Sequence, residues 1–93
     1  MSIKEILSKH QGTIIDVRNP GEVAMGAIPG AVNIPVQEIP NRIGEISKLE
    51  EPLVIYCQSG GRSGMALMML QSAGLKKEMY NGGGYFDMLQ LMN

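Results

Sequence analysis

The chain of 93 residues is long enough for one domain with one hydrophobic core. Hydrophobic residues make up 44% of it and charged residues 18%, a composition that excludes a disordered tail. Eight Lys and Arg against nine Asp and Glu give a net charge of −1, without the basic stripe typical of nucleic-acid binding. Charges, Gly or Pro interrupt every apolar run before the roughly 18 residues of a membrane-spanning helix, so we expect neither nucleic acid nor a membrane as a partner.

Helical and strand-like segments alternate along the chain. The helical spacing of apolar residues, or a helix-start signal, occurs in residues 2–9, 20–25, 36–49, 62–73 and 85–91. Within the third of these, Pro40 marks the start of a new helix. Short β-branched or continuously apolar runs predict strands at residues 13–17, 31–34, 53–57 and 78–81, and the three glycines 82–84 predict a turn.

The order of these segments predicts an α/β fold with a parallel sheet and helices on both faces. Residues 53–57 form a continuous apolar run, which suits a parallel strand that is covered on both sides. No charged residue falls between Ser63 and Gly74, so we expect the helix there to be buried nearly all round. We assign Met65, Met68 and Met69 of this helix to the core.

Cys57 is the only cysteine and His10 the only histidine. A single thiol forms no disulfide within the chain, and zinc sites built on paired cysteines or several histidines are excluded. Residues 1–5 contain no apolar signal segment, so we expect a cytoplasmic protein. We expect no metal.

The strand that ends at Cys57 is followed by a glycine-rich loop and a helix. In open parallel sheets, ligands bind at the carboxyl ends of the strands. Gly60 and Gly61 allow successive backbone N–H groups to turn inward, and the helix N-terminus adds a positive potential. Both effects favour the thiolate, which is the nucleophilic form of cysteine. The alternative is an ordinary buried cysteine at the end of a strand, but the loop and helix that follow favour a reactive one.

The sequence resembles the rhodanese family of single-domain thiosulfate sulfurtransferases. The active-site loop of that family is a Cys, four intervening residues and an Arg, usually followed by Ser, and residues 57–63 (CQSGGRS) fit this pattern. The resemblance extends upstream to residues 15–18, Glu22, residues 26–31 and residues 33–35. It implies one rhodanese domain over residues 1–93, with a three-layer fold around a parallel sheet of four to five strands. The family's short first strand has no counterpart here, which favours four.

The resemblance also implies a chemistry. Cys57 attacks the sulfane sulfur of thiosulfate or a similar donor, sulfite or its equivalent leaves, and a persulfide forms. The outer sulfur then passes to cyanide, a thiol or a protein acceptor, without a cofactor. The residues implied to bind the substrate are Gln58, Ser59, Gly60, Gly61, Arg62 and Ser63.

Two other functions remain as alternatives, a persulfide carrier that docks on a partner protein and a non-catalytic binding module. The presence of Cys57 counts against the second. Phosphatase activity is disfavoured by loop length. Tyrosine phosphatases place one more residue between Cys and Arg, and the shorter loop here suits a single sulfur atom better than a tetrahedral oxyanion.

This chain departs from the family pattern at three positions. Ala27 stands where members commonly have His, and Met88 replaces the usual Trp. Many members carry Arg or Lys directly after the cysteine, where this chain has Gln58. With one positive side chain in the loop instead of two, attraction of the thiosulfate dianion should be weaker.

Asp16 and Arg18 follow the first predicted strand at its carboxyl end, close to the predicted site. We expect them to support it structurally, with Asp16 capping backbone N–H groups and Arg18 paired with Glu22. Arg62 has two candidate roles. It either helps to bind the anionic donor or forms a salt bridge that holds the loop.

Overall fold

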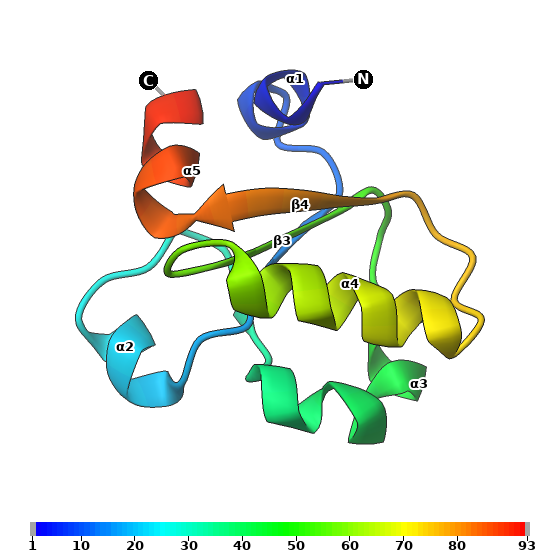
Figure 1. Cartoon of the computed structure of the whole chain (residues 1–93). Coiled ribbons are helices and arrows are strands. Elements are labelled where there is room, and N and C mark those ends of the chain that lie inside the picture. Colours follow the sequence, from blue (N-terminus) through cyan, green and yellow to red (C-terminus); the bar gives the residue numbers. More distant parts are fainter. Residues whose placement is uncertain (1, 93) are drawn as a thin grey trace.

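The computed structural model describes residues 2–92 and contains a parallel sheet as its middle layer (Figure 1). The strand order is β2-β1-β3-β4, and each neighbouring pair is parallel. The strands are β1 (Thr13–Asp16), β2 (Val32–Asn33), β3 (Leu53–Cys57) and β4 (Met79–Gly84). The predicted α/β class, the parallel pairing and the count of four strands are confirmed.

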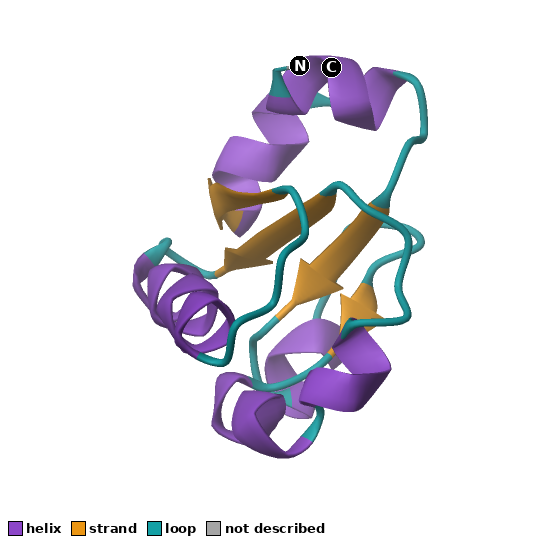
Figure 2. Cartoon of the chain, turned by 90° about the vertical axis from the view of Figure 1, so that its right-hand side faces the viewer, coloured by secondary structure: helices purple, strands orange, loops and turns teal. Residues whose placement is uncertain are grey.

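Helices cover both faces of the sheet, which confirms the predicted three layers (Figure 2). Helices α1 (Ile3–Ser8) and α5 (Tyr85–Leu91) pack on one face. The 3-10 helix η1 (Val36–Asn41), α3 (Ile43–Ile46) and α4 (Gly61–Ser72) pack on the other. The short helix α2 (Pro20–Ala24) follows β1.

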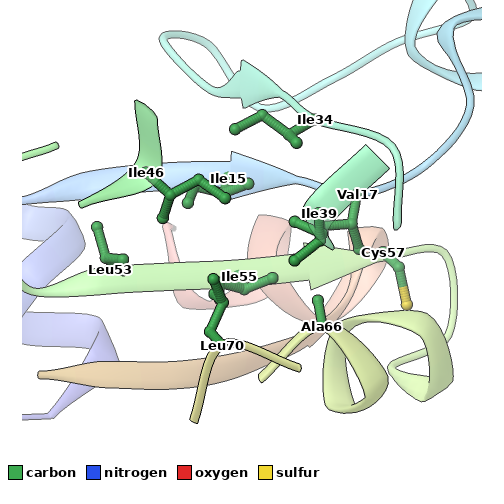
Figure 3. Packing of buried hydrophobic residues seen from close by; sticks show 10 residues of the cluster. All are labelled: Ile15, Val17, Ile34, Ile39, Ile46, Leu53, Ile55, Cys57, Ala66 and Leu70. Carbon is green, nitrogen blue, oxygen red and sulfur yellow. The ribbon is translucent and has the colours of Figure 1, made fainter. Parts of the chain in front are cut away.

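All five residues of β3 are buried, because successive side chains of the central strand enter two different cores. Leu53, Ile55 and Cys57 lie in the core under η1, α3 and α4 (Figure 3). Val54 and Tyr56 lie in the core under α1 and α5. The strand that carries Cys57 is therefore the most firmly embedded part of the sheet.

The prediction that α4 is buried nearly all round is wrong. Met65 is 51% exposed and Met68 is 68% exposed, so neither belongs to the core. Ser63, Ala66 and Leu70 face inward, and Met69 packs partly against the core. A chain of this length has no fourth layer to cover the outer side of a helix, so the lack of charge on α4 does not mean burial.

Other predicted elements change in extent. The helix expected over residues 36–49 is the 3-10 helix η1 with Pro40 inside it, followed by the single turn α3. The expectation that a new helix begins at Pro40 is therefore wrong. Because proline has no N–H to donate and its ring clashes with the preceding turn, it disfavours one continuous α-helix through this position. The strand expected at residues 31–34 is reduced to Val32–Asn33. Within residues 2–92, no helix is long and apolar enough to cross a membrane.

The three glycines 82–84 belong to β4, not to a turn. The register between β3 and β4 shifts at Ile55 and Tyr56, and Gly83 opposite this shift has φ +83°. A Cβ on Gly84 would lie 2.5 Å from the carbonyl oxygen of Gln58. Glycine at this position therefore lets β4 run directly against the cysteine loop.

Candidate active site

Cys57 is buried at the carboxyl end of β3, and its sulfur points toward the first turn of α4 (Figure 3). The sulfur accepts hydrogen bonds from the backbone N–H of Gly60, at 2.9 Å, and of Ser63, at 3.4 Å. Gly60 has φ +99°, a conformation that glycine adopts readily, and it is the N-cap of α4. The N–H of Ser63 belongs to the first helical turn, where no carbonyl of the helix can accept it. Backbone N–H groups at the start of α4 therefore surround the sulfur of Cys57.

These donors change the acidity of Cys57. Burial raises the pKa of the thiol, but hydrogen bonds from Ser63, from both its side chain and its backbone, oppose this effect, as do those from the backbones of Ser59 and Gly60. The result is a pKa below the ordinary cysteine value. The site therefore favours the nucleophilic thiolate without a histidine or lysine beside it.

Ser63 is held by a residue from the neighbouring strand. Its hydroxyl oxygen lies 3.6 Å from the sulfur of Cys57, 2.7 Å from the side-chain oxygen of Asn81 and 3.0 Å from the carbonyl of Gly60, so its single proton is shared among these three acceptors. The same oxygen of Asn81 accepts the N–H of Gly83 at 2.9 Å, which fixes the orientation of the amide. The sequence analysis did not single out Asn81. Its contact depends on the pairing of β4 with β3, for which the sequence carries no local signal.

Arg62 forms a bidentate ion pair with Glu22 of α2, at 2.7 and 2.9 Å. These hydrogen bonds, with one from the backbone of Asn19, lower the pKa of Glu22 to about 2. Of the two roles considered for Arg62, the salt bridge is therefore present. The ion pair links the cysteine loop to α2 and compensates the charge of Arg62, the only positive side chain in the loop.

The expected pair of Arg18 with Glu22 is wrong, because Arg18 instead pairs with Asp16 at 2.8 Å. Asp16 also accepts the backbone N–H of Arg18 at 2.9 Å, as predicted, and the hydroxyl of Tyr56 at 2.6 Å. The carboxylate is buried, which raises its pKa, yet hydrogen bonds from Arg18 and Tyr56 leave the pKa below the ordinary value. Arg18 is the cation nearest to Asp16 along the chain and is buried with it, so it compensates the buried carboxylate of Asp16 and leaves the partly exposed Glu22 to Arg62.

Arg18 also connects this buried pair to the loop. Its guanidinium donates to the side-chain oxygen of Gln58, at 3.2 Å, and to the carbonyl of Gly26, at 2.8 Å. It lies over the ring of Tyr85, 4.8 Å from the ring centroid. Gln58 and Ser59 themselves are exposed. Asp16 and Arg18 are thus joined to the cysteine loop through the hydrogen bond from Arg18 to Gln58.

Ala27 and Met88 are the other two positions at which this chain departs from the family pattern. Ala27 is half-buried between Gly26 and Ile28, whose N–H donates to the hydroxyl of Tyr56 at 3.0 Å. Met88 is buried in the core under α5, against Gly82. Among residues 2–92, His, Cys, Asp and Glu form no cluster of three that could hold a metal ion.

Comparison with known proteins identifies the family. Residues 2–90 match the model of the rhodanese-like domain, and the chain belongs to this family. It is 33% identical to human thiosulfate:glutathione sulfurtransferase over 101 aligned residues, which cover 95% of this chain and 88% of the human protein. It is 41% identical to a sulfurtransferase of Allochromatium vinosum over 76% of this chain, and it spans 65% of that protein's length.

Solved structures agree with this assignment. The human single-domain sulfurtransferase TSTD1 is similar to this chain with a TM-score of 0.76 and 29% sequence identity. The similarity covers 95% of this chain and 89% of the human one. The resemblance seen in the loop motif therefore extends to the whole fold.

Proposed function

We propose that this protein is a sulfurtransferase that moves sulfane sulfur through a persulfide on Cys57. The observation that carries the proposal is the position of the Cys57 sulfur, which accepts hydrogen bonds from the N–H groups of Gly60 and Ser63 at the start of α4. These N–H groups stabilise negative charge both on the Cys57 thiolate and on a terminal sulfur bound to Cys57. Relatives named as sulfurtransferases, among them one named for thiosulfate and glutathione, support the same function.

In the first step, the Cys57 thiolate attacks the outer sulfur of thiosulfate or a similar donor. A sulfur–sulfur bond forms to Cys57, and the bond within thiosulfate breaks with its electron pair on the departing sulfite. One thiolate and one dianion become one persulfide anion and one dianion, so the step needs no cofactor and no net proton transfer. The loop residues Gln58, Ser59, Gly60, Gly61, Arg62 and Ser63 surround the place where the donor binds.

In the second step, a thiolate or cyanide attacks the outer sulfur of the persulfide. The bond to Cys57 breaks, and its electron pair returns to Cys57 as the thiolate that the loop stabilises. Since Arg62 is paired with Glu22, backbone N–H groups supply most of the attraction for the anionic donor. The four residues between Cys57 and Arg62 favour this sulfur chemistry over phosphate binding.

Mass spectrometry of the intact protein after incubation with thiosulfate tests the proposal. We expect one added sulfur atom on the wild-type protein, removable by cyanide or a reductant, and none on Cys57→Ser. Circular dichroism of the variant checks that it is folded. A folded wild-type protein that gains no sulfur would contradict the proposal and favour the non-catalytic binding module. A persulfide that forms but transfers slowly to cyanide would favour the protein-docked carrier.

A further inference from the structure

A pocket of about 310 Å³ opens beside the cysteine loop, between the end of α2 and the start of α5. Met25 and Gly26 line it from the α2 side, Tyr85 and Phe86 from the α5 side, and Gln58 from the loop. In Figure 1, the loop between β3 and α4 lies between α2 and the start of α5. The pocket therefore borders the cysteine loop at Gln58, the residue that directly follows Cys57.

The rim of this pocket carries two large apolar side chains that the folded chain leaves in water. Met25 is 90% exposed, and Phe86 is 66% exposed. They come from different elements, and both line the same pocket. Exposed apolar side chains gathered around a cavity are typical of a binding surface, and Met adapts its shape to varied partners.

The charged groups of the pocket are already paired within the chain. Arg18 is bonded to Asp16, and Glu22 is bonded to Arg62. The loop residue that faces the pocket, Gln58, is neutral. An acceptor with carboxylates next to its thiol would therefore find no free cation here, whereas an acceptor with apolar groups would cover Met25 and Phe86.

We propose that the Met25–Phe86 pocket is the acceptor site, and that it receives a cysteine of a partner protein with apolar side chains next to it. The proposal rests on the sulfurtransferase function proposed above. The cavity is at the small end of the range for ligand sites, about 300–1,000 Å³, so it holds one or two side chains. The exposed outer parts of Met25 and Phe86 would remain in water beside a small thiol. A protein surface around the acceptor cysteine buries them.

In the transfer, the Cys57 persulfide anion first takes one proton from solvent on its outer sulfur, and the partner's cysteine thiolate then attacks that sulfur. A new sulfur–sulfur bond forms on the partner, and the bond to Cys57 breaks. The electron pair of that bond stays on Cys57 as the thiolate, and the proton remains on the transferred sulfur. No oxidant or reductant is consumed.

The test separates the second step from the first. The persulfide is formed with thiosulfate, excess donor is removed, and one of three acceptors is added: a short peptide with leucines on both sides of its cysteine, the same peptide with aspartates, or glutathione. Quenched mass spectrometry follows the loss of sulfur from Cys57 and its gain by the acceptor. We expect the leucine peptide to react about tenfold faster than either acidic acceptor, as expected when a pocket favours apolar groups.

Variants locate the site. Met25→Ser and Phe86→Ser, each at an exposed position, should slow transfer to the leucine peptide several-fold and remove its advantage over the aspartate peptide. Met68→Ser removes an exposed methionine of α4 outside this pocket, and it should leave both steps unchanged.

Equal rates for the three acceptors, a faster reaction with glutathione, or wild-type selectivity in both pocket variants would overturn the inference. Failure of the underlying function gives a different result, because no persulfide would form with thiosulfate before any acceptor is added. In that case the persulfide is formed with sodium polysulfide. The transfer rates to the three acceptors then test whether the pocket is the acceptor site.

Discussion

The hydroxyl of Ser63 donates a 2.7 Å hydrogen bond to the side-chain oxygen of Asn81 and lies 3.6 Å from the sulfur of Cys57. This contact joins the first turn of α4 to β4 next to the thiol of Cys57. Since Gly83 fixes the amide of Asn81 with a further hydrogen bond, the strand determines where the Ser63 hydroxyl lies. A residue from β4 therefore acts on the thiol through Ser63.

Ser63→Ala should raise the pKa of Cys57. The serine hydroxyl is one of the groups that lower this pKa, and alanine at this position leaves only the backbone donors. The rate of alkylation by iodoacetamide, measured against pH, should reach its midpoint at a higher pH than in the wild type. Ser59→Ala changes an exposed hydroxyl of the same loop and serves as the control. Identical midpoints for wild type and Ser63→Ala would contradict a role of the hydroxyl.

Gly84→Ala should impair both persulfide formation and stability. The new Cβ would lie 2.5 Å from the carbonyl oxygen of Gln58, so the backbone of the loop or of β4 must move. Such overpacking costs about 1–3 kcal/mol in the free energy of unfolding, measured by urea titration. Gly64→Ala is the matched control, because its Cβ would only touch the amide of Asn81 at 3.5 Å. It lies inside α4, where alanine should stabilise by about 0.5–1 kcal/mol. Unchanged sulfur loading in Gly84→Ala would show that the loop tolerates this displacement.

Glu22→Gln should make the stability of the protein less sensitive to acid. The pKa of Glu22 is lowered from 4.5 to about 2 in the folded chain, so its ionised form favours folding. This contribution is fully present above pH 4.5 and is lost as the pH falls toward 2. The variant should lose about 0.5–1 kcal/mol at pH 7, since the pair is partly exposed, and the difference from wild type should shrink over that range.

Urea titrations at several pH values measure this difference. Glu38→Gln, which removes an exposed ion pair with Arg42 far from the loop in sequence, is the comparison variant. A difference between wild type and Glu22→Gln that stays constant from neutral pH to pH 2 would refute the assignment of the pair.

Gln58→Lys should lower the KM for thiosulfate. Residue 58 is exposed, so a lysine there can extend into solvent near the paired Arg18 and add a free cation. An exposed charge contributes about 1 kcal/mol or less, which corresponds to about a fivefold change at low salt and less at high salt. Gln58→Met loses the hydrogen bond from Arg18 without adding charge, and thus separates the two effects. A salt-independent change in KM would argue against electrostatic attraction.

Much of the fold could be predicted from local patterns. The continuous apolar run at residues 53–57 predicted a buried parallel strand, and the structure has β3 there with every residue buried. Pro40 and the glycines 82–84 were misinterpreted, because the same residue types occur in turns, in 3-10 helices and at strand irregularities. The exposure of Met65 and Met68 could not be predicted, since an uncharged helix looks the same in sequence whether or not another layer covers it.

The sequence by itself determined the position of Cys57 and the form of its loop, because strand, thiol, glycines and helix start are consecutive in residues 53–63 and their geometry follows from local backbone preferences. Only the tertiary structure decided which charges and amides reach that loop. It paired Arg62 with Glu22 and Ser63 with Asn81. Arg62 is 40 residues from Glu22 along the chain, and Ser63 is 18 from Asn81. Such partners are selected by the packing of parallel strands and the demand that buried polar groups be satisfied, and neither leaves a local pattern in the sequence.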